Sequence, residues 1–206
     1  MTEEDREYRF VVEPLIGWLK KQNWCYQTPE YHTSARGWDI EAGRKNECLL
    51  IEAKYISGPS IAVLAGLVAA PLANRALRLK IPECNERAGI KPLAKLVPWC
   101  CWAIGINPPG QIGSEVYKST TRNMYQILFD FMGRNSKFWK HYGEDLRMKY
   151  IFFVEKGEIT RIPFTDFLFM TKQYVELTRA DGKKLKERRQ IAEDLLNKYR
   201  SASLFK

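Results

Sequence analysis

The sequence predicts a single α/β domain with a mixed β-sheet, and three observations lead to this prediction. The chain has 206 residues, of which 45% are hydrophobic, enough for one good core but not for two full domains. Apolar stretches typical of strands alternate with segments of helical periodicity. No internal repeat or low-complexity tract interrupts this alternation.

The N-terminal part is expected to form one helix followed by three strands. The helix is predicted over residues 3–21, because apolar residues recur at i, i+3, i+4 and i+7 from Val12. Pro14 predicts either a kink or a helix start at that point. The strands are predicted in WCYQTPEY, GWDIEA and ECLLIEAKYI, and a polar turn at residues 43–46 joins the last two.

The rest of the chain continues the alternation of helices and a few strands. The stretch WCCWAIGI is apolar on both faces, so it is predicted to be a central strand. KYIFFVEKGEITRIPF is predicted to be a hairpin that turns around Gly157. Helices are predicted over residues 61–80, over 114–142, from an N-cap at Thr165, and in a cationic segment over 181–200.

Charge and cysteine content narrow the classes of partner. The formal net charge of +9 and the isoelectric point of about 9.3 favour a polyanionic partner such as nucleic acid. The acidic N-terminus does not resemble a signal peptide, and the apolar run at residues 61–73 is too short to span a membrane. The five cysteines lack C-x-x-C spacing, which favours reduced thiols over disulfides or a zinc site. We therefore expect a cytoplasmic protein with no membrane partner.

The stretch LLIEAKY, residues 49–55, places two charges in an otherwise aliphatic strand. Alternate residues of a strand point to the same face, so Glu52 and Lys54 share a face with Leu50. Such charges are rarely buried without partners. If the preceding hairpin turns at residues 45–46, opposed residues have numbers that sum to 91, and Asp39 lies opposite Glu52.

Two opposed carboxylates destabilise a sheet unless a cation joins them. Oxygen ligands of this kind suit Mg²⁺ or Mn²⁺, so Asp39 and Glu52 are the candidate metal ligands. Lys54 would then orient a nucleophilic water or stabilise negative charge on a phosphate. The alternative interpretation is a structural ion pair between Lys54 and either Asp39 or Glu41 at the end of the hairpin.

The pattern of Asp39 followed by Glu52-Ala53-Lys54 resembles the D…E-x-K signature of the PD-(D/E)xK nuclease superfamily. The resemblance covers roughly residues 12–106, with the predicted hairpin at residues 150–163 as its continuation. Restriction endonucleases and archaeal-type Holliday junction resolvases are the members of the superfamily that the core resembles. It implies a restriction-endonuclease-like three-layer core, in which helices flank a mixed central sheet. Relative to that core, about 1–106 and 147–178, residues 107–146 are expected to be a helical insertion and about 181–206 a basic C-terminal helix.

The resemblance also implies roles for individual residues. A glutamate of the N-terminal helix often completes such sites, and Glu13 is the matching candidate, as a catalytic residue or a further metal ligand. The backbone carbonyl of Ala53 is a further candidate ligand. Cleavage would leave a 5′-phosphate and a 3′-hydroxyl. A homodimer is expected if both strands of a duplex are cut, because this requires two sites.

Basic residues outside this motif are candidates for nucleic-acid contact. They lie in a loop before Asp39, in the proposed insertion and in the C-terminal helix: His32, Arg36, Lys118, Arg122, Lys183, Lys184, Lys186, Arg188 and Arg189. Solvated surface is the alternative for each of them. The aromatic residues of the insertion are expected to pack on the core of the domain rather than stack on bases.

The function expected from the sequence is Mg²⁺-dependent hydrolysis of phosphodiester bonds in nucleic acid, with DNA endonuclease as the first choice. A non-catalytic nucleic-acid-binding module on the same fold is one alternative. A nuclease that acts on RNA or on branched junctions is another, because loops and insertions determine the substrate in such folds.

Overall fold

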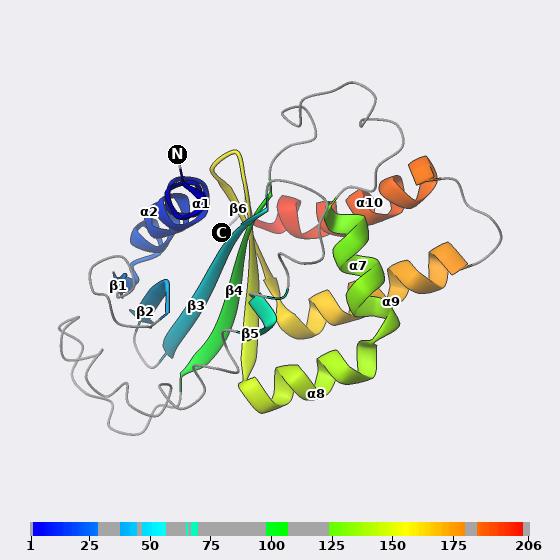
Figure 1. Ribbon diagram of the computed structural model, residues 1–206, viewed down its shortest axis with the longest axis horizontal. Helices are drawn as coiled ribbons and strands as arrows, with labels where there is room; N and C mark the ends of the chain where they lie inside the picture. Colours follow the sequence, from blue (N-terminus) through cyan, green and yellow to red (C-terminus); the bar gives the residue numbers. More distant parts are fainter. Residues whose placement is uncertain are drawn as a thin grey trace.

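The computed structural model describes residues 2–28, 38–44, 47–56, 65, 67–69, 98–106, 124–179 and 185–203. Within these ranges the chain forms an α/β domain with a six-stranded mixed sheet that helices flank on both sides (Figure 1). The α/β class and the mixed sheet predicted from the sequence are confirmed.

The N-terminal helical layer has three consecutive parts: α1 (Glu3–Glu7), a π-helical turn η1 (Tyr8–Val12) and α2 (Glu13–Lys21). A capping box starts α1, in which the Thr2 hydroxyl accepts from the Asp5 N–H and the Asp5 carboxylate accepts from the Thr2 N–H. Pro14 lies in the first turn of α2, where its missing N–H costs least. Of the two alternatives predicted at Pro14, the structure shows a helix start, which comes one residue earlier, at Glu13, directly after the π-helical turn.

The strands of the sheet lie in chain order, β1 to β6. Their bounds are β1 (Cys25–Gln27), β2 (Ile40–Arg44), β3 (Glu47–Ile56), β4 (Trp99–Ile106), β5 (Met148–Glu155) and β6 (Glu158–Pro163). β4 is parallel to both of its neighbours, and the other neighbouring strands are antiparallel. The prediction that the apolar β4 is central is confirmed.

Both predicted hairpins form. In β2–β3, Ile40 pairs with Ile51 and Arg44 with Glu47, so the numbers of paired residues sum to 91, as predicted. In β5–β6, the two turn residues Lys156 and Gly157 have φ values of 51° and 83°. Positive φ at both positions is typical of a two-residue turn whose twist matches the flanking strands.

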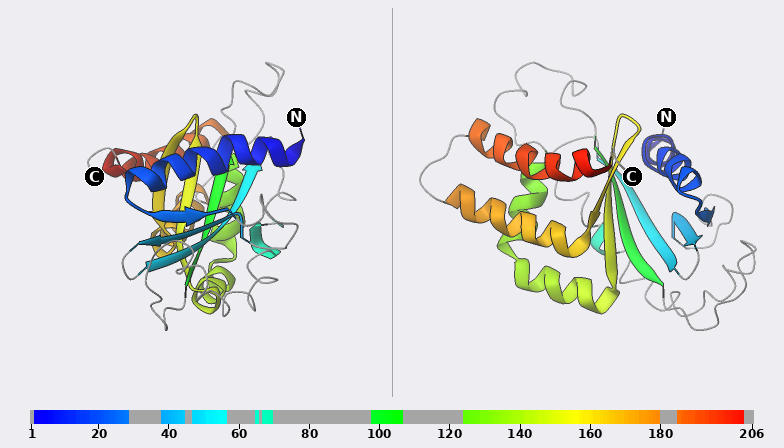
Figure 2. Two further views of the ribbon diagram at one scale, coloured as in Figure 1. Left: turned by 90° about the vertical axis from the view of Figure 1, so that its left-hand side faces the viewer. Right: turned by 180° about the vertical axis from the view of Figure 1, so that it is seen from behind.

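The sheet has a separate hydrophobic core on each face. One core joins the N-terminal helices to the sheet, and Val11, Val12 and Leu15 are fully buried in it. The other lies beneath α7 (Met124–Arg134), α8 (Ser136–Leu146), α9 (Phe164–Arg179) and α10 (Leu185–Ser203). Figure 2 shows the N-terminal helices crossing one face, with these four helices behind the sheet.

Helices α7 and α8 complete the crossover between the parallel strands β4 and β5, a connection that parallel strands require. Tyr125 and Trp139 from this segment are 3% and 1% exposed, which confirms that these aromatic residues pack in the core. Helix α9 begins at Phe164, so its N-cap position is Pro163 and the prediction that Thr165 is the N-cap is wrong by two positions. α10 buries Ala192, Leu195 and Leu196, as its apolar pattern predicts.

Some sequence-based expectations lie outside the described residues, including most of the predicted helix at 61–80.

The four described cysteines are free, and three of them, Cys48, Cys100 and Cys101, are buried. Burial raises the pKa of the Cys48 thiol to about 12. Among the helices of the described ranges, none combines the length and the apolar character needed to cross a membrane.

Candidate functional site

The candidate site is built on the part of β3 that extends beyond its pairing with β2. That pairing begins at Ile40 opposite Ile51, whereas β3 runs alongside β4 as far as Ile56 opposite Ile106. Asp39 directly precedes β2, and one further step of the same register would set it opposite Glu52. The three motif residues therefore come from adjacent segments at one end of the sheet.

Asp39 is buried at this end, with 3% of its surface exposed. Its Oδ2 accepts a hydrogen bond of 2.6 Å from the backbone N–H of Ala53. A short bond to an ionised carboxylate is stronger than a neutral one, so it fixes the carboxylate beside β3. The N–H and C=O of a strand residue point to the same edge, so the Ala53 carbonyl also lies on the side of Asp39.

Glu52 lies on the face of the sheet that α7 to α9 cover. Leu50 and Ile56, on the same side of β3 by alternation, both belong to that core. Glu52 is partly buried and pairs in register with Trp102 of β4. The pKa of Tyr142 on α8 is raised, mainly by its burial, and the negative charge of Glu52 contributes to the shift.

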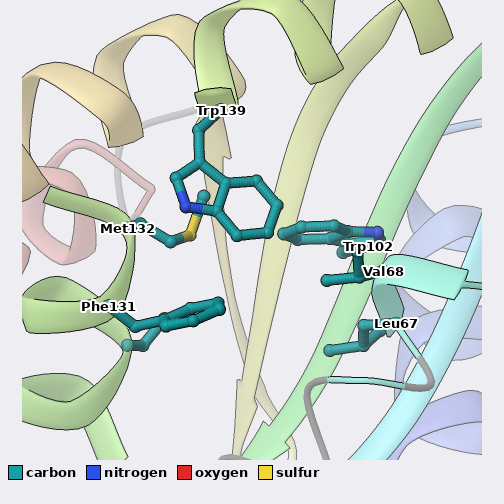
Figure 3. A pocket seen from close by; sticks show the side chains of 7 residues that line it. Leu67, Val68, Trp102, Phe131, Met132 and Trp139 are labelled. Atoms are coloured by element: carbon teal, nitrogen blue, oxygen red, sulfur yellow. The ribbon is translucent and has the colours of Figure 1, made fainter. Parts of the chain in front are cut away.

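Trp102, the neighbour of Glu52 on β4, borders an apolar region of this face. Trp102 forms one wall of a small pocket with Leu67 and Val68, and side chains of α7 and α8 form the opposite wall (Figure 3). The Tyr142 hydroxyl donates a 3.0 Å hydrogen bond to the Val68 carbonyl and so ties α8 to this segment. A carboxylate next to such a region gains more from a cation than it would in water, because the local dielectric is lower.

Lys54 connects β3 to the N-terminal helical layer. Its Nζ lies 3.1 Å from Oε2 of Glu7 on α1, and the two side chains are 28% and 10% exposed. Glu7 was not among the residues singled out from the sequence. The signal that could have found it is its position four residues before the buried Val11, where a carboxylate continues the apolar stripe of the helix.

Glu13, the helix glutamate chosen from the sequence, is exposed at the start of α2. Within the described part of the chain, no contact joins it to Asp39, Glu52 or Lys54, whereas Glu7 reaches Lys54 directly. Glu41, the other acidic residue of the alternative ion pair, accepts a hydrogen bond from the side chain of Gln27 on β1.

Most candidate nucleic-acid-binding residues cannot be placed relative to this site. His32, Arg36, Lys118, Arg122, Lys183, Lys184 and the side chain of Lys186 lie outside the described residues. Arg188 and Arg189 are partly buried on α10, which packs against α7, α9 and β6.

The donor atoms at the site suit a hard divalent cation. Across the described ranges, no group of three or more His, Cys, Asp and Glu side chains is arranged to hold a metal. Mg²⁺, however, needs only one or two carboxylates and keeps several waters. The buried Asp39 carboxylate, the opposed Glu52 and the neighbouring Ala53 carbonyl fit this requirement with oxygen donors alone.

No protein-family model matches the chain, and comparison with curated proteins and with solved structures gave no significant match. The function is therefore argued from the geometry of the site.

Proposed function

We propose that this protein is a Mg²⁺- or Mn²⁺-dependent phosphodiesterase acting on nucleic acid, a DNA endonuclease of the PD-(D/E)xK type with a restriction-endonuclease-like fold. The observation that carries the proposal is the 2.6 Å hydrogen bond from Ala53 to Asp39, which holds a buried carboxylate against the residue that separates Glu52 from Lys54 on β3. An ordinary hairpin end has no need of a buried carboxylate at this position.

Asp39, Glu52 and the Ala53 carbonyl would hold the ion. When bound, the ion supplies Lewis-acid stabilisation of negative charge on a phosphate. The protein contributes orientation: the backbone N–H of Ala53 holds Asp39, and Glu52 follows the last residue of β3 that pairs with β2.

Lys54 would orient the attacking water or neutralise charge that develops on the phosphate. Lys54 is a residue of β3, and the ion pair with the Glu7 carboxylate on α1 restricts the position of its ammonium group. Glu7 thus acts as a positioning residue that couples the N-terminal helix to the site. Glu13 is too exposed at the start of α2 to be assigned this role.

The proposed substrate follows from charge and from the motif. A net charge of +9 favours a polyanion, and DNA is the first choice because the motif resembles that of DNA nucleases. Cutting both strands of a duplex would require a homodimer or two encounters. The same chemistry could cleave RNA or branched junctions, so the experiment below includes both as substrates.

The test is cleavage of linear duplex, branched and single-stranded DNA and of structured RNA, in the presence of Mg²⁺ or Mn²⁺. Wild type is compared with Lys54→Ala and with Lys172→Ala, a control that removes the same charge from an exposed position on α9. We expect cleavage with 5′-phosphate products in wild type and the control. In Lys54→Ala we expect its loss, with binding of the substrate kept within a few-fold.

Two results would contradict the proposal. Unchanged turnover in Lys54→Ala would remove Lys54 from the mechanism. Binding of nucleic acid with no cleavage under any of these conditions would instead identify a binding module.

A further inference from the structure

A second cluster of cationic and aromatic side chains lies on the face of the sheet that the N-terminal helices cross. It consists of three partly exposed aromatic residues and three cations, which we call the cation–ring belt: Trp18, Trp99, Arg147, Lys149, Tyr150 and Arg161. The three rings pack against the core beneath the N-terminal helices. The belt draws on α2, on β4 to β6 and on Arg147, the residue between α8 and β5.

Within the belt each cation lies over at least one ring. The Arg147 guanidinium is 4.3 Å and the Lys149 ammonium 5.0 Å from the centre of the Trp99 ring. Arg161 lies 5.0 Å from the Tyr150 ring and 5.6 Å from the Trp18 ring, and so joins β5 to α2. Cations held over rings are already ordered, so they lose less conformational freedom when they bind an anion.

The same arrangement continues to either side of the belt. Arg44 of β2 lies 4.5 Å from the Trp24 ring, and Lys20 of α2 lies 5.4 Å from the Tyr26 ring. The acidic residue that contacts the belt within the described ranges is Glu47, which forms an ion pair with Lys149. The surface therefore keeps a clear excess of positive charge.

The belt is set apart from the candidate active site by its place in the sheet. Glu47, which contacts the belt, and Glu52, in the candidate site, are about 17 Å apart along β3, from the rise per residue of a strand. Arg161 of the belt is level with Ala53 in the strand register but lies three strands away, which is about 14 Å across the sheet. The belt rings belong to the core beneath the N-terminal helices, whereas Leu50 and Ile56, which alternate with Glu52 and Lys54, belong to the other core. The catalytic chemistry proposed above therefore does not account for the belt.

We propose that the cation–ring belt binds single-stranded nucleic acid. Ordered cations would contact the phosphates, and the partly exposed rings would contact the bases. This combination is typical of surfaces that bind single strands, because their bases are free to contact rings. A duplex hides its base faces, so the exposed parts of Trp18, Trp99 and Tyr150 could not contact its bases. The proposal extends the proposed function, yet binding at the belt requires neither the metal nor Glu52.

The tryptophans of the chain provide a specific readout. Of its six tryptophans, Trp24, Trp38, Trp102 and Trp139 are 1–5% exposed, while Trp18 and Trp99 are partly exposed and belong to the belt. Oligothymidylate is titrated into the full chain with EDTA, following tryptophan fluorescence and the anisotropy of a labelled oligonucleotide. We expect binding with quenching of tryptophan fluorescence, and weaker binding of a dA·dT duplex of the same length.

The variant is Arg147→Gln with Arg161→Gln. The matched control is Lys140→Gln with Lys172→Gln, which removes two exposed cations from α8 and α9 on the other side of the sheet. We expect the belt variant to bind about tenfold more weakly, with a salt dependence that is less steep by about 1.4 in log Kobs against log salt. The control should bind like wild type, and melting curves verify that both variants fold.

Three outcomes would overturn the proposal: no binding of oligothymidylate by folded wild type, binding without a change in tryptophan fluorescence, or equal binding by the belt variant and the control. A duplex that binds as tightly as the single strand would overturn the assignment of the partner. Because the titration contains no divalent ion, its result is independent of whether the protein cleaves nucleic acid.

Discussion

Asp39 is a buried carboxylate that a backbone donor of β3 helps to hold in place. Burying a charge is costly unless hydrogen bonds or a cation compensate for it. The Ala53 N–H supplies one such bond, at the point where β2 no longer pairs with β3. In the absence of metal, the Asp39 side chain therefore both satisfies a backbone group and opposes a second carboxylate.

Two variants of Asp39 distinguish the hydrogen bond to the Ala53 N–H from the repulsion between the two carboxylates. Asp39→Asn keeps an oxygen acceptor for the Ala53 N–H and removes the charge opposite Glu52, so we expect metal-free stability to be equal to that of wild type or higher. Asp39→Ala leaves that N–H without its acceptor, and we expect a loss of about 1–3 kcal/mol. Urea denaturation in EDTA measures both. A large destabilisation in Asp39→Asn would favour a structural ion pair over a metal site.

The ion pair between Lys54 and Glu7 differs from the other ion pairs because it joins the helical layer to the motif. Lys54 is about a quarter exposed, so the contribution of the pair to stability is expected to be modest. Its value in the proposed function is geometric, because Glu7 restricts the position of the Lys54 ammonium.

Two glutamates of the N-terminal helices test this role. Glu7→Gln should lower cleavage by about 10–100-fold, the usual effect of losing a residue that orients a catalytic group. Glu13→Gln, at an exposed position, should cleave like wild type. Steady-state cleavage rates of the two variants provide the comparison. If Glu13→Gln is the impaired variant, the choice of helix glutamate made from the sequence was the better one.

At the scale of elements, a glycine of β4 sets the distance between the N-terminal helix and the sheet. A Cβ on Gly105 would lie 2.3 Å from Cγ2 of Val11 in η1 and 3.2 Å from the Tyr55 ring. The helix therefore approaches the sheet more closely here than any side chain on β4 would permit. This contact lies one helical turn from Glu7, so it helps to position the partner of Lys54.

Gly105→Ala should consequently destabilise the protein by about 1–3 kcal/mol through overpacking. The same change in a Val11→Ala background should cost less, because the clashing methyl groups are absent. A double-mutant cycle of unfolding free energies measures this coupling. Equal costs of Gly105→Ala in both backgrounds would show that the helix can move away freely.

Elements with a strong local pattern could be predicted from the sequence. β3 and β4 follow from apolar runs, and the β2–β3 register follows from a short polar turn, because the turn fixes which residues are opposed. Glu7 could not be chosen reliably, because the π-helical turn before Pro14 changes the phase of the helix. The cation–ring belt combines α2 with residues of three strands, so no local pattern indicates it.

At the scale of the whole molecule, the two faces of the sheet have different environments. One face is covered by α7 to α10, and Trp102, Trp139 and Phe129 are almost fully buried there. The other is crossed by the N-terminal helices and carries the cation–ring belt at its margin. The proposed catalytic end and the proposed strand-binding surface are thus held on one sheet.

The central claim is that Asp39 and Glu52 together bind a catalytic divalent cation. The most direct measurement is titration of Mg²⁺ and Mn²⁺ into wild type and Glu52→Gln, following thermal stability and DNA cleavage in parallel. The account predicts that metal raises the Tm of wild type and supports cleavage, and that Glu52→Gln loses both effects. No effect of either ion on the Tm or on cleavage by wild type would contradict the account.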